Sequence, residues 1–177
     1  MLTSCTPISL VLKIGPDGAD YLGDISQRIK FTETITPHVS LIQGKATNAD
    51  LHKLVKWIES NYSSLPKILS FEKSLNVDSP LGIYLDVLKN SADYELLSSL
   101  NKRLVETVET MQELDSVLNR INNNLPHDIG LIEKYGRDFY VPENFSPHIT
   151  LFYGYHKVTF LQQLERSVFP ISDVSLY

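Results

Sequence analysis

Two short phrases of this chain nearly repeat each other, and each holds a histidine and a hydroxyl side chain two residues apart. Residues 36–44 read TPHVSLIQG, and residues 146–154 read SPHITLFYG. Every difference in the first six positions is conservative. A two-fold arrangement that points both phrases into one cleft would bring two imidazoles and two hydroxyls together. Such a set suits general acid–base chemistry on a phosphate ester.

The residue types in the phrases fit that chemistry. An imidazole titrates near neutral pH, so one histidine can accept a proton from water while the other donates one to a leaving oxygen. A hydroxyl two residues along a strand lies beside its histidine and can donate a hydrogen bond to a non-bridging phosphoryl oxygen. We therefore expect His38 and His148 to be catalytic, and Ser40 and Thr150 to bind phosphate.

Strand alternation assigns the other residues of each phrase. It places Ile42 on the face of the first histidine and Phe152 on the face of the second. Phe152 and the nearby Tyr155 are then candidates to stack a nucleobase, although packing at the cleft floor is an equal alternative for Phe152. The proline before each histidine is expected to begin each strand, and the glycine at its end to terminate it.

Hydrophobic patterning predicts the elements that position the phrases. It favours strands at 8–14, 68–75, 82–88 and 173–177, helices at 17–30, 47–61, 91–113 and 159–167, and a long connection over 119–144. Thr47 is expected to cap the second helix. The layout is a rough internal duplication within one domain of residues 1–177. Its lobes span about 17–90 and 91–177, and the strand at 8–14 can be shared between them.

Composition narrows the class of protein. The chain has 177 residues, 42% of them hydrophobic, and a net charge of −5. This balance argues against an extensive surface for duplex nucleic acid. The single cysteine, Cys5, fits a reducing compartment, and no secretory signal or membrane span is evident. We expect a monomeric, cytoplasmic protein without a membrane partner.

Metal and cofactor sites are not indicated by the sequence. Each phrase offers one good metal ligand, and there is no cysteine cluster. A glycine loop of the phosphate-cradling kind is also missing, because the run at 15–18 lacks the following lysine and hydroxyl residue. We therefore expect no metal and no cofactor.

The paired His-x-Ser/Thr phrases at His38 and His148 resemble those of the two-histidine (2H) phosphoesterase superfamily, and in size its bacterial RNA ligase-like and cyclic phosphodiesterase branches. The resemblance implies an α+β, bilobal fold in which two antiparallel sheets flank a concave cleft, with helices outside. It also implies catalysis by the two histidines and phosphate binding by Ser40 and Thr150. The implied activity is metal-independent hydrolysis of 2′,3′-cyclic phosphates at RNA ends or on nucleotides.

Two other functions fit the same residues. The nearest is a 2′-5′ phosphodiesterase that acts on oligonucleotides. The alternative of another class is a non-catalytic module that binds RNA ends. Turnover of a cyclic mononucleotide would separate the enzyme from the binding module, and the sequence leaves open which histidine is the acid and which the base.

Overall fold

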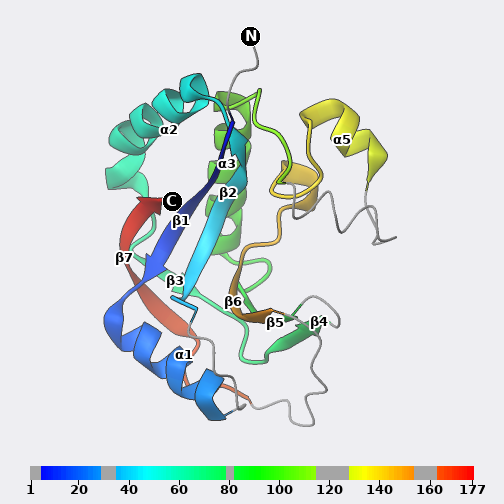
Figure 1. The fold of residues 1–177 in the computed structure, drawn as a ribbon. Helices are drawn as coiled ribbons and strands as arrows, with labels where there is room; N and C mark the ends of the chain where they lie inside the picture. Colours follow the sequence, from blue (N-terminus) through cyan, green and yellow to red (C-terminus); the bar gives the residue numbers. More distant parts are fainter. Residues whose placement is uncertain (1–4, 29–34, 79–81, 115–127, 154–162) are drawn as a thin grey trace.

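The apolar strand near the N-terminus becomes an inner strand of one antiparallel sheet. β1 (Thr6–Ile14) pairs with β2 (His38–Ala46) on one side and with β7 (Val168–Leu176) on the other. Seven strands form this sheet in the order β3-β7-β1-β2-β6-β5-β4 (Figure 1). The computed structural model describes residues 5–28, 35–78, 82–114, 128–153 and 163–177, and the remaining strands are β3 (Ile68–Ser70), β4 (Asn76–Asp78), β5 (Gly82–Asp86) and β6 (His148–Tyr153).

Helices cover the apolar face of the sheet. Every second residue of β1 from Ile8 to Ile14 is at most 5% exposed, which defines the buried face. Figure 1 shows α3 behind β1 and β2, with α2 beside it. The molecule is therefore an α+β protein, and no helix among the described residues is long and apolar enough to cross a membrane. The described helices are α1 (Pro16–Arg28), α2 (Asn48–Asn61), α3 (Ala92–Thr107) and α5 (Ile129–Tyr135), with short 3-10 turns η1 (Tyr62–Ser64) and η2 (Pro142–Asn144).

Local signals in the sequence account for the start of α2. The Thr47 hydroxyl accepts a hydrogen bond from the Asp50 backbone N–H, and the Asp50 carboxylate accepts one from the Thr47 backbone N–H. This reciprocal pair satisfies two backbone donors that the first helical turn leaves without partners. The predicted cap at Thr47 is confirmed.

The longest predicted helix ends earlier than its apolar spacing indicates. α3 stops at Thr107 and a turn follows, closed by a hydrogen bond of 3.1 Å from the Met111 N–H to the Val108 carbonyl. Gln112 and Lys45 then exchange backbone hydrogen bonds of 2.8 and 3.0 Å. Val108 and Met111 are still buried, but from this turn rather than from a helix. The backbone groups of Gln112 find their hydrogen-bond partners at the end of β2. Apolar residues at helical spacing therefore do not require the helix to continue.

Other expectations about the elements are wrong. The described part of the predicted helix at 159–167 is not helical, because Gln163 forms a β-bridge with Ser74 and the Leu164 N–H donates to the Lys73 carbonyl. β7 begins at Val168, five residues before the predicted strand at 173–177. The strand predicted at 68–75 is limited to β3.

A single sheet stands where two flanking sheets were expected, so the bilobal arrangement is not confirmed.

Gly44 lies inside β2 rather than at its end, which corrects its expected role as a terminator. A Cβ at this position would lie 2.6 Å from the Gln112 carbonyl oxygen and 2.8 Å from Cε of Met111. Real Cβ atoms do not approach a backbone oxygen so closely, so the segment 111–113 can cross β2 here only because residue 44 has no side chain. Gly44 therefore serves a close approach between backbones.

We expect Gly44→Ala to lower the free energy of unfolding by about 1–3 kcal/mol, the usual cost of inserting a methyl group into a packed site. Gly23→Ala on α1 is the matched control, because no atom lies within 4 Å of a Cβ at Gly23. The control should gain about 0.5–1 kcal/mol from helix propensity. Urea unfolding of both variants measures the difference, and equal values would contradict the packing of 111–113 on β2.

Candidate active site

The two strands that carry the repeated phrases are neighbours in the sheet. β2 and β6 run antiparallel and pair at Val39 and Ile149, whose side chains are both fully buried. The four residues on either side of this pair alternate to the opposite face. The antiparallel register puts each histidine opposite the hydroxyl residue of the other phrase, and diagonal neighbours in such a ladder lie about 7–8 Å apart. The structure thus brings together His38, Ser40, His148 and Thr150.

Each phrase contains a β-bulge at the same position. In β2, Val11 pairs with Ser40 but Leu10 pairs with Ile42, so Leu41 is an extra residue. In β6, Tyr84 pairs with Thr150 and Ile83 with Phe152, so Leu151 is the extra residue. Both bulges immediately follow the hydroxyl residue. The similarity of the phrases therefore extends from their sequence to their backbone geometry.

The bulges overturn the expected face of two residues. An extra residue reverses the alternation, so Ile42 and Phe152 lie on the face opposite their histidines. Ile42 is fully buried, and Phe152 packs against the hydrophobic core. The expected shared face is wrong for both residues, and Phe152 loses the geometric basis for a stacking role. Tyr155, the second stacking candidate, lies outside the described residues.

Both histidines are held by the same backbone contact. Nδ1 of His38 donates to the Thr36 carbonyl, and Nδ1 of His148 donates to the Ser146 carbonyl, each at 2.7 Å. A carbonyl oxygen can only accept, so the hydrogen must reside on Nδ1 in both rings. In the neutral ring Nε2 then carries the lone pair, and in the charged ring it carries a proton to donate. Each imidazole can therefore act as acid or base through Nε2.

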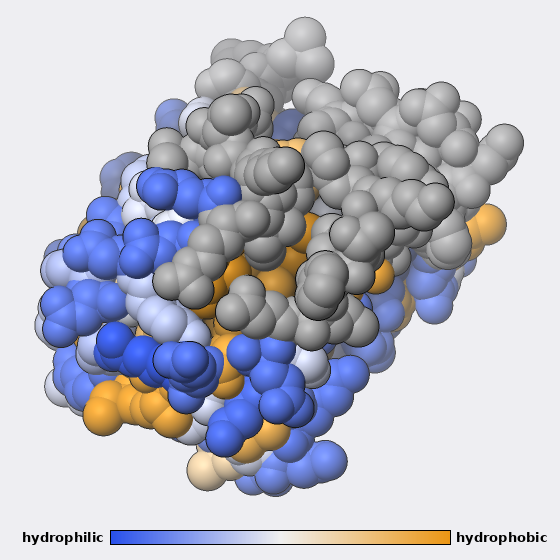
Figure 2. All heavy atoms as spheres, turned by 90° about the horizontal axis from the view of Figure 1, so that it is seen from below, coloured by the Kyte–Doolittle hydropathy of each residue, from blue (hydrophilic) through white to orange (hydrophobic). Residues whose placement is uncertain are grey.

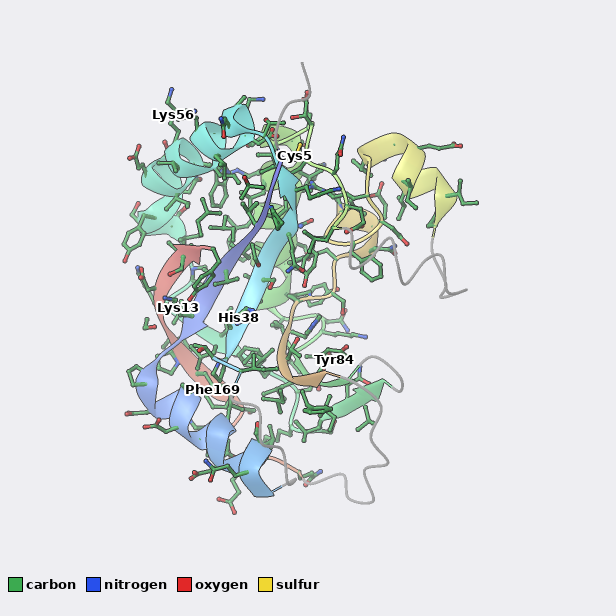
Figure 3. The ribbon with its side chains drawn as sticks, viewed as in Figure 1. Cys5, Lys13, His38, Lys56, Tyr84 and Phe169 are labelled. Atoms are coloured by element: carbon green, nitrogen blue, oxygen red, sulfur yellow. The ribbon has the colours of Figure 1, made fainter. Side chains whose placement is uncertain are left out.

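The strands that flank β2 and β6 add polar residues to the face that carries both histidines. We call the two repeated phrases the motifs and this face the motif face. Lys13 of β1 is the register partner of His38, and Asp86 of β5 is the register partner of His148. Tyr84 pairs with Thr150, and its ring packs edge-on against that of His148 with centroids 4.6 Å apart. Figure 3 shows Lys13, His38 and Tyr84 in the lower half of the sheet, whereas Cys5 lies at the opposite end.

These flanking residues were not predicted from the sequence, although the sequence carries signals for them. Tyr84 and Asp86 are the polar members of an alternating strand that was itself predicted. Lys13 is the only charged residue in the apolar run from Ile8 to Ile14. Period-two patterning could have marked all three as residues of the polar face, but not which strand they would pair with.

Burial distinguishes His148 electrostatically. Loss of hydration in its half-buried position lowers the pKa of His148, and repulsion from a charged His38 lowers it further. The Ser146 carbonyl and the Asp86 carboxylate act in the opposite direction but do not outweigh burial. His148 is therefore neutral at neutral pH and able to accept a proton.

A hollow of about 450 Å³ lies next to the first motif but does not match a phosphate site. It lies between α1 and the segment at Thr36 and Pro37, and Leu151 contributes to its wall. Asp20 and Asp24 on α1 line it, and their carboxylates would repel a phosphate. Figure 2 shows hydrophobic residues at the centre of the lower face, with hydrophilic residues to the left of them and below.

Comparisons with known proteins leave the family open. A scan against family models and searches of curated proteins and of solved structures found no match to this chain. In the part of the chain that the structure describes, no group of three or more histidine, cysteine or acidic side chains is placed to hold a metal ion. The geometry of the two motifs is therefore the basis for a proposed function.

We expect His148 to titrate with a midpoint below 6.5 and both neutral imidazoles to carry their hydrogen on Nδ1. Nitrogen-15 NMR across a pH series measures the midpoint and the tautomer, and His148→Ala and His52→Ala assign the resonances. The unfolded chain binds the proton of His148 more tightly than the folded one, so stability should fall as pH drops from about 6.5 through the lower folded value. A midpoint above 6.5 would contradict the burial of this ring.

Proposed function

We propose that this protein is a metal-independent phosphodiesterase of the two-histidine type, which hydrolyses 2′,3′-cyclic phosphates at RNA ends or on nucleotides. One observation carries the proposal. His38 and His148 lie on one face of adjacent strands, and each is held through Nδ1 by a backbone carbonyl two residues earlier. A hydroxyl residue accompanies each histidine. A phosphate bound at this face would meet an acid, a base and two hydrogen-bond donors.

Two features of the sheet support the proposal that the chain folds as two lobes related by a pseudo-two-fold axis. The phrases share the proline, the histidine anchor, the hydroxyl and the bulge. β1 and β2 pair from Thr6–Ala46 to Lys13–His38, whereas the described pairing of β2 with β6 is limited to Val39–Ile149. We infer that β3-β7-β1-β2 and β6-β5-β4 correspond to the two lobes, and that their axis passes through this pair.

The proposed reaction needs only the four motif side chains and water. The base removes a proton from a water molecule as the water oxygen bonds to phosphorus. The bond from phosphorus to one ribose oxygen breaks, and the acid delivers its proton to that oxygen. Hydroxyls of Ser40 and Thr150 donate to the non-bridging oxygens, where negative charge gathers. The product is a phosphomonoester, and solvent restores the two imidazoles to their starting protonation states.

The direction of proton transfer follows from the environment of His148. Burial favours its neutral form through a lowered pKa, so His148 is suited to be the base. His38 then supplies the proton to the leaving oxygen. Each role is performed by Nε2, because Nδ1 remains bonded to the carbonyl of residue 36 or 146.

We expect His38→Ala and His148→Ala each to lower kcat/KM by about 10²–10⁴-fold, the usual loss when a general acid or base is removed. The assay uses a panel of 2′,3′-cyclic, 3′,5′-cyclic and 2′-5′-linked substrates in excess chelator. His52→Ala is the matched control, because His52 is exposed on α2.

The substrate panel also discriminates among the alternatives. Turnover of only the 2′-5′-linked substrate would identify the second phosphodiesterase activity. Binding of RNA ends without turnover would identify a non-catalytic module. Retention of full activity by a well-folded variant of either motif histidine would rule out the paired mechanism.

We expect Ser40→Ala and Thr150→Ala each to lower kcat by about 10–100-fold, less than the roughly 10²–10³-fold loss of a fixed oxyanion-hole donor. Thr150 is 8% exposed, so Thr150→Val separates the lost donor from lost packing by keeping the shape of the side chain. Ser63→Ala in η1 is the exposed control. Unchanged kcat in both motif variants would show that the hydroxyls do not contact the phosphate.

A further inference from the structure

His148 is in contact with groups on its neighbouring strand β5. Asp86 is its direct register partner, and both side chains lie on the motif face. The Tyr84 ring packs against the imidazole on the same face. The Asp86 carboxylate is itself fixed, because its Oδ2 accepts a hydrogen bond of 2.9 Å from Nδ2 of Asn76 on β4. A held carboxylate therefore stands alongside the proposed base.

The equivalent place beside the other histidine carries the opposite charge. Lys13 occupies the same place beside His38 that Asp86 occupies beside His148, since each is the register partner on the strand that flanks the motif strand. A hydrogen bond with Tyr177 raises the pKa of Lys13, and the charge of Asp173 adds to this effect, so Lys13 is fully protonated at neutral pH. The two motifs are alike, but their flanks are opposite in charge.

We propose that Asp86 is a positioning residue of the reaction: its carboxylate stabilises the imidazolium that forms on His148 when this ring takes the proton from water. This inference depends on the proposed phosphodiesterase function. Asp86 acts through space on the ring, because Nδ1 of His148 is already bonded to the Ser146 carbonyl. Its task parallels that of the aspartate in a serine protease triad, which stabilises the charged histidine without taking its proton.

The charge on His148 determines at which stage of the reaction Asp86 stabilises the ring. Before proton transfer the ring is neutral, and burial keeps it so. After it accepts a proton, the ring is a cation in a half-buried position, and Asp86 is the described carboxylate that faces it. The other titratable groups that face the ring are Tyr84 on β5 and His38 on β2, with Lys13 beyond on β1. His38 has donated its proton by then, so the new positive charge is not opposed by a second imidazolium.

The test is Asp86→Asn, which keeps an oxygen for the bond from Asn76 while it removes the charge. We expect kcat/KM at the optimum to fall about tenfold, the effect of a neighbouring charge worth about one unit of pKa. The acid limb of the pH–rate profile and the NMR midpoint of His148 should both move to lower pH, because the carboxylate raises the pKa of this ring. Asp86→Glu should restore most of both readouts.

Controls keep this test independent of stability. Glu59→Gln on α2 removes one exposed carboxylate elsewhere and should change neither the rate nor the midpoint. If Asp86→Asn does not fold, Asn76→Ala replaces it, since the loss of its anchor should weaken the effect of Asp86 in the same direction on both readouts.

The outcomes separate this inference from the function it depends on. Active wild type, inactive histidine variants and an unchanged His148 midpoint in Asp86→Asn would overturn the role of Asp86 alone. A purely structural role would lower activity without moving the acid limb, and that result would overturn it too. Wild-type protein that turns over no substrate of the panel would overturn both the function and this inference.

Discussion

The pairing of Val39 with Ile149 is the constraint on which the proposed site depends. Both side chains are fully buried on the helix-covered face, so the neighbouring residues of each strand must point to the other face. A slip of one residue in either strand would turn that strand's histidine toward the core. The apolar side chains of the motifs therefore determine the positions of the polar ones. A site at the junction of two strands also requires both halves of the sheet to be folded.

α3 ties together the two segments that this pairing joins. Nδ2 of Asn101, which is fully buried, donates to the Leu41 carbonyl at the β2 bulge and to the Tyr140 carbonyl in the connection to β6, each at 2.8 Å. The Tyr94 hydroxyl donates to the Phe145 carbonyl, just before the second motif. Buried backbone groups near both motifs thus find partners on one rigid helix. These hydrogen bonds fix the backbone near both histidines relative to α3.

Short-range patterns in the sequence predicted much of this fold, and long-range pairing accounts for what they missed. The cap at Thr47 and the start of each motif strand after its proline depend on neighbouring residues, and both are confirmed. The bulges depend on how β1 and β5 pair with the motif strands, so a strict period of two misassigned Ile42 and Phe152. Adjacent apolar residues, Leu41 with Ile42, were the available sign of a break in alternation. The single sheet likewise depends on one pair of distant residues.

Acid–base chemistry needs the two motifs to be alike in geometry but different in their electrostatic surroundings. Equivalent anchors give both imidazoles the same tautomer and the same reach through Nε2. A reaction that moves one proton in and another out nevertheless needs the two rings to differ at its start. Two identical surroundings would leave either histidine equally able to hold the proton, and half of the molecules would be wrongly charged. Burial of His148 supplies that difference, because it lowers the pKa of this ring and leaves it neutral at the start. Asp86 acts after the transfer, by stabilising the imidazolium that forms, and neither effect alters the geometry that the repeat provides.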